Sequence, residues 1–145
     1  MKPAPFDFVR AGSLEEALAA LAEGGEDAKP LAGGQSLVPA LAMRLVRPTL
    51  LVDLNRAGLD AVEANGALRL GATVRQAALV GDDRVHPLVR AALPFVGHVA
   101  TRNRGTVGGS IAHADGAAEL PLCLVALGGA VVVAGPGGRR EIPAE

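Results

Sequence analysis

Aromatic side chains are almost missing from this sequence, which contains three phenylalanines and no tryptophan or tyrosine. Half of the residues, 50%, are hydrophobic, and most of these are small aliphatic residues from which any core must be built. Proteins that bind single-stranded nucleic acid usually stack the bases on aromatic rings. The shortage of aromatic rings therefore argues against that class of protein.

An excess of charge of one sign is also missing. The chain carries 14 basic and 15 acidic residues, which gives a formal net charge of −1, and no basic tail or stripe occurs along it. Binding of duplex nucleic acid depends on many lysine and arginine contacts with phosphates. We therefore expect no nucleic-acid partner.

Cysteine occurs once, at Cys123. A single cysteine excludes a disulfide within the chain, and it excludes a metal or iron–sulfur site built from cysteines. Because Cys123 lies in the apolar run LPLCLVAL, we predict that it is a buried helix residue.

Long hydrophobic runs are missing as well. No apolar run follows Lys2, as it would in a signal peptide. No stretch reaches the roughly 18 uninterrupted apolar residues that a membrane span needs. These two absences lead us to expect a cytoplasmic protein without a membrane span.

The 145 residues that are present suffice for about one domain. Ser13-Leu14-Glu15-Glu16 has the form of a capping box and predicts a helix that ends at Gly24-Gly25. Three further elements follow: a strand over residues 28–32, a helix over 36–45 with Pro39 in its first turn, and a strand over 49–54. This order predicts a small parallel βαβ unit in the first third of the chain.

The rest of the chain has a different pattern. Apolar segments on both sides of Asn65-Gly66 predict a hairpin in a separate antiparallel sheet. Thr73 to Gln76 forms a second capping-box pattern, which predicts the start of a short helix. The remaining elements that we predict are a helix from His86-Pro87 through residues 88–100, a helix over 119–127, a strand over 130–134, a turn over 135–138 and a return strand from 141 to 143.

Two segments share one design, LAGGQS at residues 31–36 and GTVGGS at residues 105–110. Adjacent glycines let successive backbone N–H groups converge on one point, and they let an anion approach without meeting a Cβ. The lysine of a P-loop and the G-x-G-x-x-G fingerprint of dinucleotide-binding folds do not occur here. The pair of segments therefore indicates the pyrophosphate of a flavin dinucleotide, bound in another way.

Several charged and histidine residues near the second segment allow other interpretations. His113 and Asp115 are not expected to act as a catalytic pair, because flavin electron transfer needs no such dyad and no nucleophile lies nearby in the sequence. A metal site from His98, His113 and Asp115 matches no common ligand spacing. Arg102 and Arg104 either offset the charge of the cofactor or belong to a solvated or ion-paired loop, and the sequence leaves both interpretations open.

The run LAGGQSLVPALAMRLVRPTLLVDLN, followed by ATRNRGTVGGSIAHADGAAELP, resembles the FAD-binding (medium) flavoprotein subunits of molybdenum hydroxylases. That group includes carbon monoxide dehydrogenase and xanthine dehydrogenase, and the resemblance extends over nearly the whole chain. It implies an α+β fold of the vanillyl-alcohol-oxidase and peptidoglycan-reductase type. The implied division is a βαβ-like FAD-binding subdomain at 1–56 and a second FAD-binding subdomain at 57–145, with an antiparallel sheet and helices, incomplete at its C-terminal end.

The same resemblance implies the residues that hold FAD. It implies neither a catalytic residue nor a metal ligand. The first pyrophosphate loop would consist of Ala32, Gly33, Gly34, Gln35 and Ser36, and the second of Thr106, Val107, Gly108, Gly109 and Ser110. Glu119, or else Asp115, would bind the sugar chain of the cofactor.

From these two loops follows a geometric expectation. The pairs Gly33-Gly34 and Gly108-Gly109 should lie in loops and face each other across a crevice, with their amides directed at one anion. A Cβ at any of the four positions would then occupy space that a phosphate oxygen needs. His113 should make no phosphate contact.

The function implied is that of an oxidoreductase subunit. Such a subunit takes electrons from an iron–sulfur subunit to FAD and passes them to an acceptor, in a complex with a molybdenum-cofactor subunit. Because members of the group are about twice as long, the chain is identified as a truncated or split member, for which we expect association with a partner subunit or with itself. The alternative is a non-catalytic interaction or assembly module that no longer retains FAD.

Overall fold

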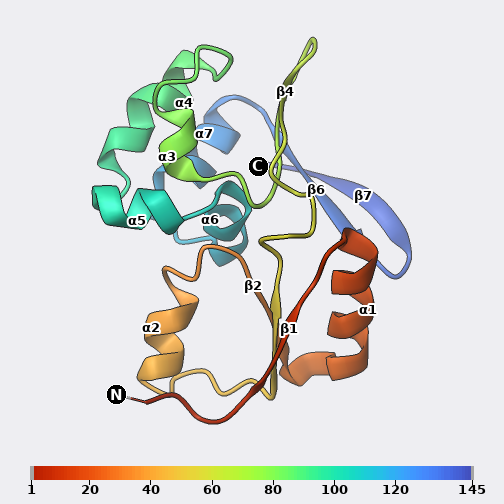
Figure 1. The fold of residues 1–145 in the computed structure, drawn as a ribbon. Coiled ribbons are helices and arrows are strands. Elements are labelled where there is room, and N and C mark those ends of the chain that lie inside the picture. Colours follow the sequence, from red (N-terminus) through yellow and green to blue (C-terminus); the bar gives the residue numbers. More distant parts are fainter. Residues whose placement is uncertain (1, 145) are drawn as a thin grey trace.

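The computed structural model describes residues 2–144, and its N-terminal third is built on a three-stranded parallel sheet. Its strands are β1 (Asp7–Arg10), β2 (Ala28–Leu31) and β3 (Leu50–Asp53), in the order β1-β3-β2. The short helix α2 (Leu37–Ala42) connects β2 with β3 (Figure 1). The predicted parallel βαβ unit is therefore confirmed. Strand β1 was not predicted, because four residues of mixed polarity give no clear period.

The helix α1 (Leu14–Gly24) begins at the predicted capping box. The Ser13 hydroxyl accepts a hydrogen bond from the Glu16 amide at 3.1 Å, and the Glu16 carboxylate accepts one from the Gly12 amide at 2.7 Å. A single 3-10 turn, η1 (Gly25–Asp27), leads from α1 into β2. The buried face of α1 packs on the sheet around Ala11, Ala17 and Val52, so the core of this part is small and aliphatic.

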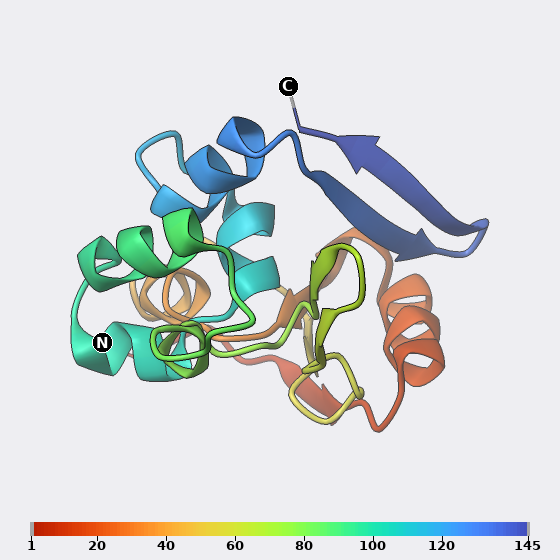
Figure 2. The ribbon, with the colours of Figure 1, turned by 90° about the horizontal axis from the view of Figure 1, so that it is seen from above.

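The second part of the molecule holds two antiparallel hairpins, and neither pairs with the parallel sheet. Strands β4 (Val62–Ala64) and β5 (Leu68–Leu70) form the hairpin predicted at Asn65-Gly66, where Gly66 has φ 79°. Strands β6 (Ala130–Gly135) and β7 (Gly138–Pro143) form the other. This hairpin projects from the helices of the second part on the side of α1 (Figures 1 and 2).

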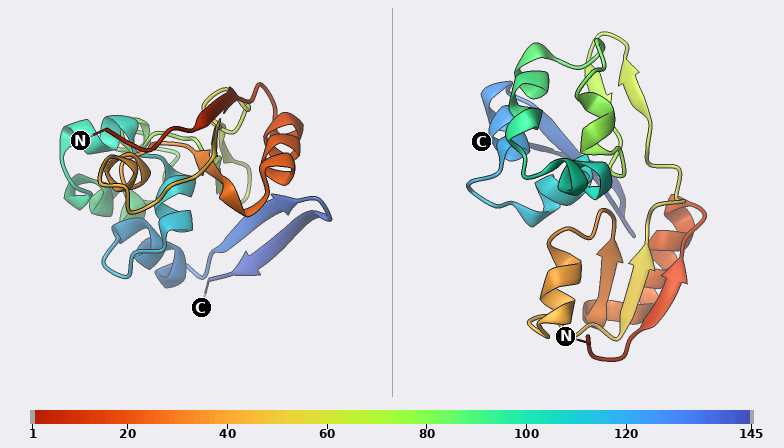
Figure 3. Two further views of the ribbon diagram at one scale, coloured as in Figure 1. Left: turned by 90° about the horizontal axis from the view of Figure 1, so that it is seen from below. Right: turned by 60° about the vertical axis from the view of Figure 1, so that its left-hand side comes forward.

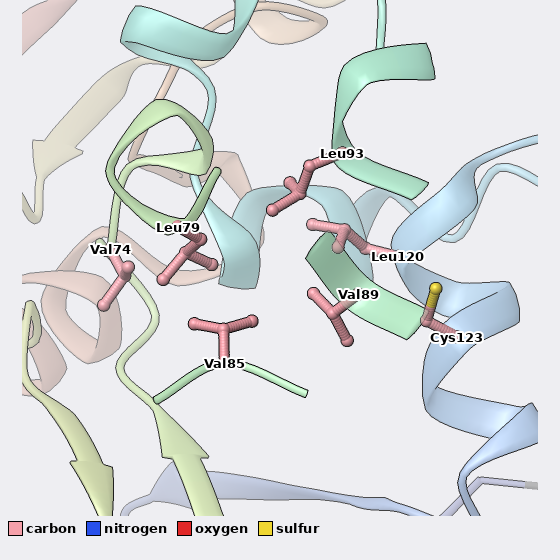
Figure 4. Close-up of a cluster of buried hydrophobic side chains, with 7 residues drawn as sticks. All are labelled: Val74, Leu79, Val85, Val89, Leu93, Leu120 and Cys123. Carbon is pink, nitrogen blue, oxygen red and sulfur yellow. The ribbon is translucent and has the colours of Figure 1, made fainter. Parts of the chain in front are cut away.

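A cluster of short helices completes the second part, which lies against the end of the parallel sheet (Figure 3, right). They are α3 (Gln76–Leu79), α4 (Pro87–Ala92), the 3-10 turn η2 (Leu93–Phe95), α5 (Val99–Arg104), α6 (Val107–His113) and α7 (Glu119–Ala126). These helices share one hydrophobic core of seven buried side chains (Figure 4): Val74, Leu79, Val85, Val89, Leu93, Leu120 and Cys123.

Cys123 is 4% exposed and lies in helix α7, so the predicted buried helix residue is confirmed. Burial raises the pKa of its thiol, and the nearby Glu119 carboxylate raises it further. The thiol therefore stays protonated and acts as a small apolar side chain of the core.

Two sequence predictions about the helices are wrong. The second capping box does not form: Arg75 is the N-cap of α3 and makes no side-chain cap, and Thr73 is buried. The long helix predicted over 88–100 is broken into α4, η2 and α5 by Pro94 and by Gly97, which has φ 47°. Apolar residues keep a helical spacing across both positions, so the sequence pattern gave no sign of the break.

The Arg102 side chain closes this break. One guanidinium nitrogen donates to the carbonyls of Val96 and Gly97 at 2.9 and 3.0 Å, and more weakly to that of Pro94 at 3.3 Å. Carbonyls at the end of a helical segment need such donors. Of the two interpretations of Arg102, the structure thus favours a structural loop contact over neutralisation of a cofactor.

Helices of the described chain are short, and none combines the length and the apolar composition that crossing a membrane requires.

Candidate functional site

The two glycine segments meet in space, at the boundary between the two parts of the molecule. A Cβ placed on Gly33 would lie 2.5 Å from the Arg104 carbonyl oxygen, 2.9 Å from Gly105 Cα and 3.0 Å from the Thr106 nitrogen. A Cβ on Gly109 would lie 4.0 Å from that of Ala32. The segments therefore pack directly on each other, whereas the sequence predicted that they face each other across a crevice.

The first glycine segment leaves its backbone donors free. Within the described residues 2–144, the amides of Gly33, Gly34, Gln35 and Ser36 donate no hydrogen bond to another protein group. The segment leads from the carboxyl end of β2 into α2, and Gly34 has φ 70°, which favours glycine. Consecutive unpaired N–H groups of this kind are available to bind an anion.

The second glycine segment differs from its expected geometry. Gly108 and Gly109 lie in the first turn of helix α6 and not in a loop, and the buried Thr106 is its N-cap. The amides of this turn all have protein acceptors: Val107 donates to Val74 O, Gly108 to Ala72 O, Gly109 to Thr106 Oγ1 and Ser110 to Thr106 O. The expectation that both segments direct free amides at one anion is therefore wrong for the second segment.

The steric role assigned to the glycines also needs correction. A Cβ on Gly108 would lie 2.7 Å from Ala72 Cα, one on Gly109 2.7 Å from Thr106 Oγ1, and one on Gly34 3.0 Å from Val38 Cγ2. Each Cβ would lie too close to an atom of the protein itself. Larger side chains at Gly34 or Gly109 would therefore disturb the local fold, and would not leave it intact as the sequence suggested.

A cavity of about 540 Å³ opens beside the first segment. It lies at the carboxyl ends of the parallel strands, where α/β sheets commonly bind ligands. Its wall contains Phe8, Arg10, Leu31, Ala32, Gly33, Gly34, Gln35, Val38, Pro39, Asp53, Asn55, Arg75, Asn103 and Arg104. Three arginines thus share this wall with the free amides of Gly33, Gly34 and Gln35, and this chemistry suits a diphosphate.

Four wall residues form a hydrogen-bonded chain that the sequence reasoning missed. Arg10 Nε donates to Asp53 Oδ2 at 3.0 Å, and Asn55 Nδ2 donates to Asp53 Oδ1 at 2.5 Å and to Ala32 O at 3.0 Å. Arg75 donates to Asn55 Oδ1 at 2.6 Å and to Arg104 O. Arg10 and Asp53 end strands β1 and β3, so the rule that ligands bind at carboxyl strand ends was the available signal.

Asp53 is 6% exposed and is the acidic member of this chain. Burial alone would raise the pKa of its carboxyl group, but hydrogen bonds from the Asn55 amide and side chain and the contact with Arg10 hold that pKa below its usual value. A carboxyl group with a lowered pKa in the folded state stabilises the fold above its unfolded pKa of about 3.9. That contribution disappears as the pH falls through the folded-state pKa.

Asp53→Asn should therefore lower the free energy of unfolding at pH 7 by about 1–2 kcal/mol, the value of a charge-assisted hydrogen-bond set. The difference in free energy of unfolding between variant and parent should shrink below about pH 4 and vanish as the pH falls through the folded-state pKa. The reason is that Asp53 of the parent is then protonated and no longer carries a carboxylate. Urea unfolding of both proteins at several pH values between about 7 and 3 measures it. A difference that stays constant over this range would contradict the assignment.

The remaining predicted site residues lie outside the cavity. Ser36 does not belong to its wall, and neither does any residue from Thr106 to Ser110, although Thr106 and Gly109 pack against the first segment. Asp115 is exposed between α6 and α7, where it accepts a hydrogen bond from the Ala117 amide at 2.9 Å, and Glu119 is the first residue of α7. His113 is exposed at the end of α6. In residues 2–144, no three His, Cys, Asp or Glu side chains come together as metal ligands would.

Comparisons with known proteins identify the family of the chain. Residues 4–145 match the family described as the FAD binding domain in molybdopterin dehydrogenase. The chain is 48% identical to the 6-hydroxypseudooxynicotine dehydrogenase complex subunit alpha of Paenarthrobacter nicotinovorans, over 99% of this chain and 50% of that one. It is 38% identical to the carbon monoxide dehydrogenase medium chain of Hydrogenophaga pseudoflava, over 100% of this chain and 52% of that one.

Solved structures give the same result. Carbon monoxide dehydrogenase from Hydrogenophaga pseudoflava, in a form that lacks the Mo-pyranopterin moiety, superposes with a TM-score of 0.96 at 37% identity, over 99% of this chain and 52% of that one. Quinoline 2-oxidoreductase from Pseudomonas putida 86 gives 0.95 at 41% identity, over the same shares. The fold expected from the sequence is thereby confirmed.

The chain spans about half the length of the relatives it matches, at 50% and 52% of the two named above. Nearly every residue of this chain takes part in these matches. The chain therefore belongs to the family of FAD-binding domains in molybdopterin dehydrogenases, and its cofactor is FAD.

Proposed function

We propose that this chain is the FAD-binding part of the electron-transfer subunit of a molybdenum-containing hydroxylase or dehydrogenase. In a complete complex, bound FAD receives electrons from an iron–sulfur subunit and passes them to an acceptor. The protein binds and orients the cofactor, and no side chain of the chain is assigned an acid–base step. The single observation that carries the proposal is the row of unpaired amides from Gly33 to Ser36, of which Gly33, Gly34 and Gln35 line a cavity together with three arginines.

The binding residues have distinct roles in this proposal. The amides of Gly33, Gly34, Gln35 and Ser36 donate to the phosphate oxygens, and Ala32 begins the loop. Thr106, Val107, Gly108, Gly109 and Ser110 form the second segment, which packs against the loop and holds it in place. Glu119 or Asp115 binds the sugar chain, which requires the cofactor to extend past the end of α6. The subdomain boundary then lies near residue 56, after β3.

Assembly is part of the proposal. Large apolar side chains are exposed on α7 and on β6, with Leu122 69% and Val132 57% exposed. Edges of such two-stranded hairpins and exposed apolar surface favour association. Two relatives are named as a complex subunit alpha and a medium chain. We infer an iron–sulfur subunit and a molybdenum-cofactor subunit as partners in the cytoplasm, with self-association as a second mode.

Titration of the purified chain with flavins, followed by flavin fluorescence, tests the proposal. Because the free amides recognise a diphosphate, FAD should bind and ADP should compete with it, whereas FMN at the same concentration should compete at least about tenfold less well. A protein that is colourless and binds neither FAD nor ADP would contradict the proposal. It would favour the alternative of an interaction or assembly module without FAD.

A further inference from the structure

The structure joins the two glycine segments through one side-chain bridge. Asn55 donates to the carbonyl of Ala32, in the first segment directly before Gly33, at 3.0 Å. Arg75 donates to the carbonyl of Arg104, the same oxygen that lies against Gly33. The bridge is closed where Arg75 Nη2 donates to Asn55 Oδ1 at 2.6 Å. Two side chains thus span the contact between the first and second parts of the molecule.

The donors and acceptors of the bridge are fixed by the other hydrogen bonds that its side chains make. Asn55 must turn its oxygen to Arg75, because its NH₂ group donates to Asp53 Oδ1 and Ala32 O. The Arg75 guanidinium uses two of its nitrogens for two different acceptors, a geometry that a lysine ammonium cannot reproduce. Both acceptors are neutral oxygens, so the contact depends on the shape of the guanidinium more than on its charge.

The backbone around Arg75 adds to this fixed geometry. Arg75 forms an antiparallel bridge with Thr106, in which Gln76 N donates to Gly105 O at 3.0 Å and Val107 N donates to Val74 O at 3.0 Å. Arg75 is therefore held rigidly to the second segment by its backbone. Its side chain then reaches back to the first part of the molecule.

We propose that Arg75, acting through Asn55, is a positioning residue that fixes the free amides of residues 33–36 for the diphosphate of FAD. This inference rests on the proposed function and adds to it the residue pair that preorganises the site. A binding loop held in its bound geometry loses less entropy when the ligand binds. The bridge contributes to affinity in this way, without requiring a contact between Arg75 and the cofactor.

Substitution of both bridge residues tests the proposal by FAD titration. Arg75→Met and Asn55→Ala should each weaken FAD binding about 10- to 100-fold, the effect of losing a hydrogen bond to a charged group. The double variant should be no weaker than the more affected single variant, because both substitutions remove the same bridge. Arg75→Lys should fail to restore affinity. Asn55 is exposed, so its substitution leaves the core intact.

Arg84→Met is the matched control. Arg84 lies near Arg75, but it pairs with Asp82 at 2.6 Å and donates to Val62 O at 3.1 Å, away from both glycine segments. Its substitution should leave FAD affinity unchanged. If Arg75→Lys keeps the affinity of the parent, Arg75 acts by its charge and the positioning role is overturned. If Asn55→Ala binds FAD as the parent does, the bridge through Asn55 is not needed and the role is overturned as well.

Amide hydrogen exchange without FAD gives a second, independent measurement. Arg75→Met and Asn55→Ala should speed exchange at hydrogen-bonded amides that report on the two segments, those of Val38, which donates to Gly34 O, and of Gln76, which donates to Gly105 O. Arg84→Met should not change exchange at these amides. If the parent binds no FAD, the proposed function fails, yet this measurement still decides whether the bridge orders the loops. Unchanged exchange in both bridge variants would overturn the positioning role whatever the cofactor result.

Discussion

Gly33→Val should weaken FAD binding by more than about 100-fold, which corresponds to more than about 2.7 kcal/mol. The Cβ alone would lie 2.5 Å from the Arg104 carbonyl oxygen and 3.0 Å from the Thr106 nitrogen. Both atoms belong to the backbone, so neither can rotate away. The two segments must then separate, which moves the free amides of residues 33–36 and strains the bridge through Arg75.

The same substitution should lower the free energy of unfolding by about 1–3 kcal/mol, the usual cost of overpacking. FAD titration and urea unfolding measure the two effects. Gly81→Val is the control, because a Cβ on the exposed Gly81 meets no atom within 4 Å. FAD binding by Gly33→Val within about threefold of the parent, under 1 kcal/mol, would contradict the observed contact between the segments.

Leu79→Ala should have the largest effect on stability. The Leu79 side chain is 0% exposed and lies among the seven buried side chains of the helical cluster (Figure 4). Truncation of a fully buried leucine costs about 2–5 kcal/mol, because both apolar transfer energy and packing are lost. For a chain of this size, the melting temperature should fall by roughly 5–15 °C.

Thermal and urea unfolding of Leu79→Ala measure this loss. Leu122→Ala is the matched control, since it makes the same chemical change in helix α7 at a side chain that is 69% exposed. Its effect should stay within about 0.5 kcal/mol. Equal destabilisation by the two substitutions would mean that the helical cluster is not the core that stabilises the second part.

The sequence identified those parts of the fold that depend on short-range chemistry. The Ser13 cap, the Asn65-Gly66 turn and the strand–helix–strand order of residues 28–53 each depend on neighbours within a few positions. Such elements can be predicted from local propensity and from the spacing of apolar residues, because both are read from neighbouring positions. The family resemblance rested on two continuous runs, residues 31–55 and 100–121, each of which contains one glycine segment.

Breaks in a pattern were harder to predict. Apolar periodicity continued across Pro94 and Gly97, where the chain ends one helix and begins another. Gly108 and Gly109 were expected in a loop because glycine is a poor helix former, yet they begin α6. Close contact with Ala72 requires glycine at position 108, and this tertiary requirement outweighs helix propensity.

By itself, the sequence determined the fold class and the family, and it predicted the first glycine segment as a site for a diphosphate. Only the tertiary structure decided which amides are free, and it gave that role to residues 33–36 while pairing those of 107–110 within the protein. It also brought Arg10, Asp53, Asn55 and Arg75 together, from positions up to 43 residues apart in a single contact. Such partners share no local period, because hydrogen bonds between distant segments depend on how packed elements meet and not on the order of neighbouring residues.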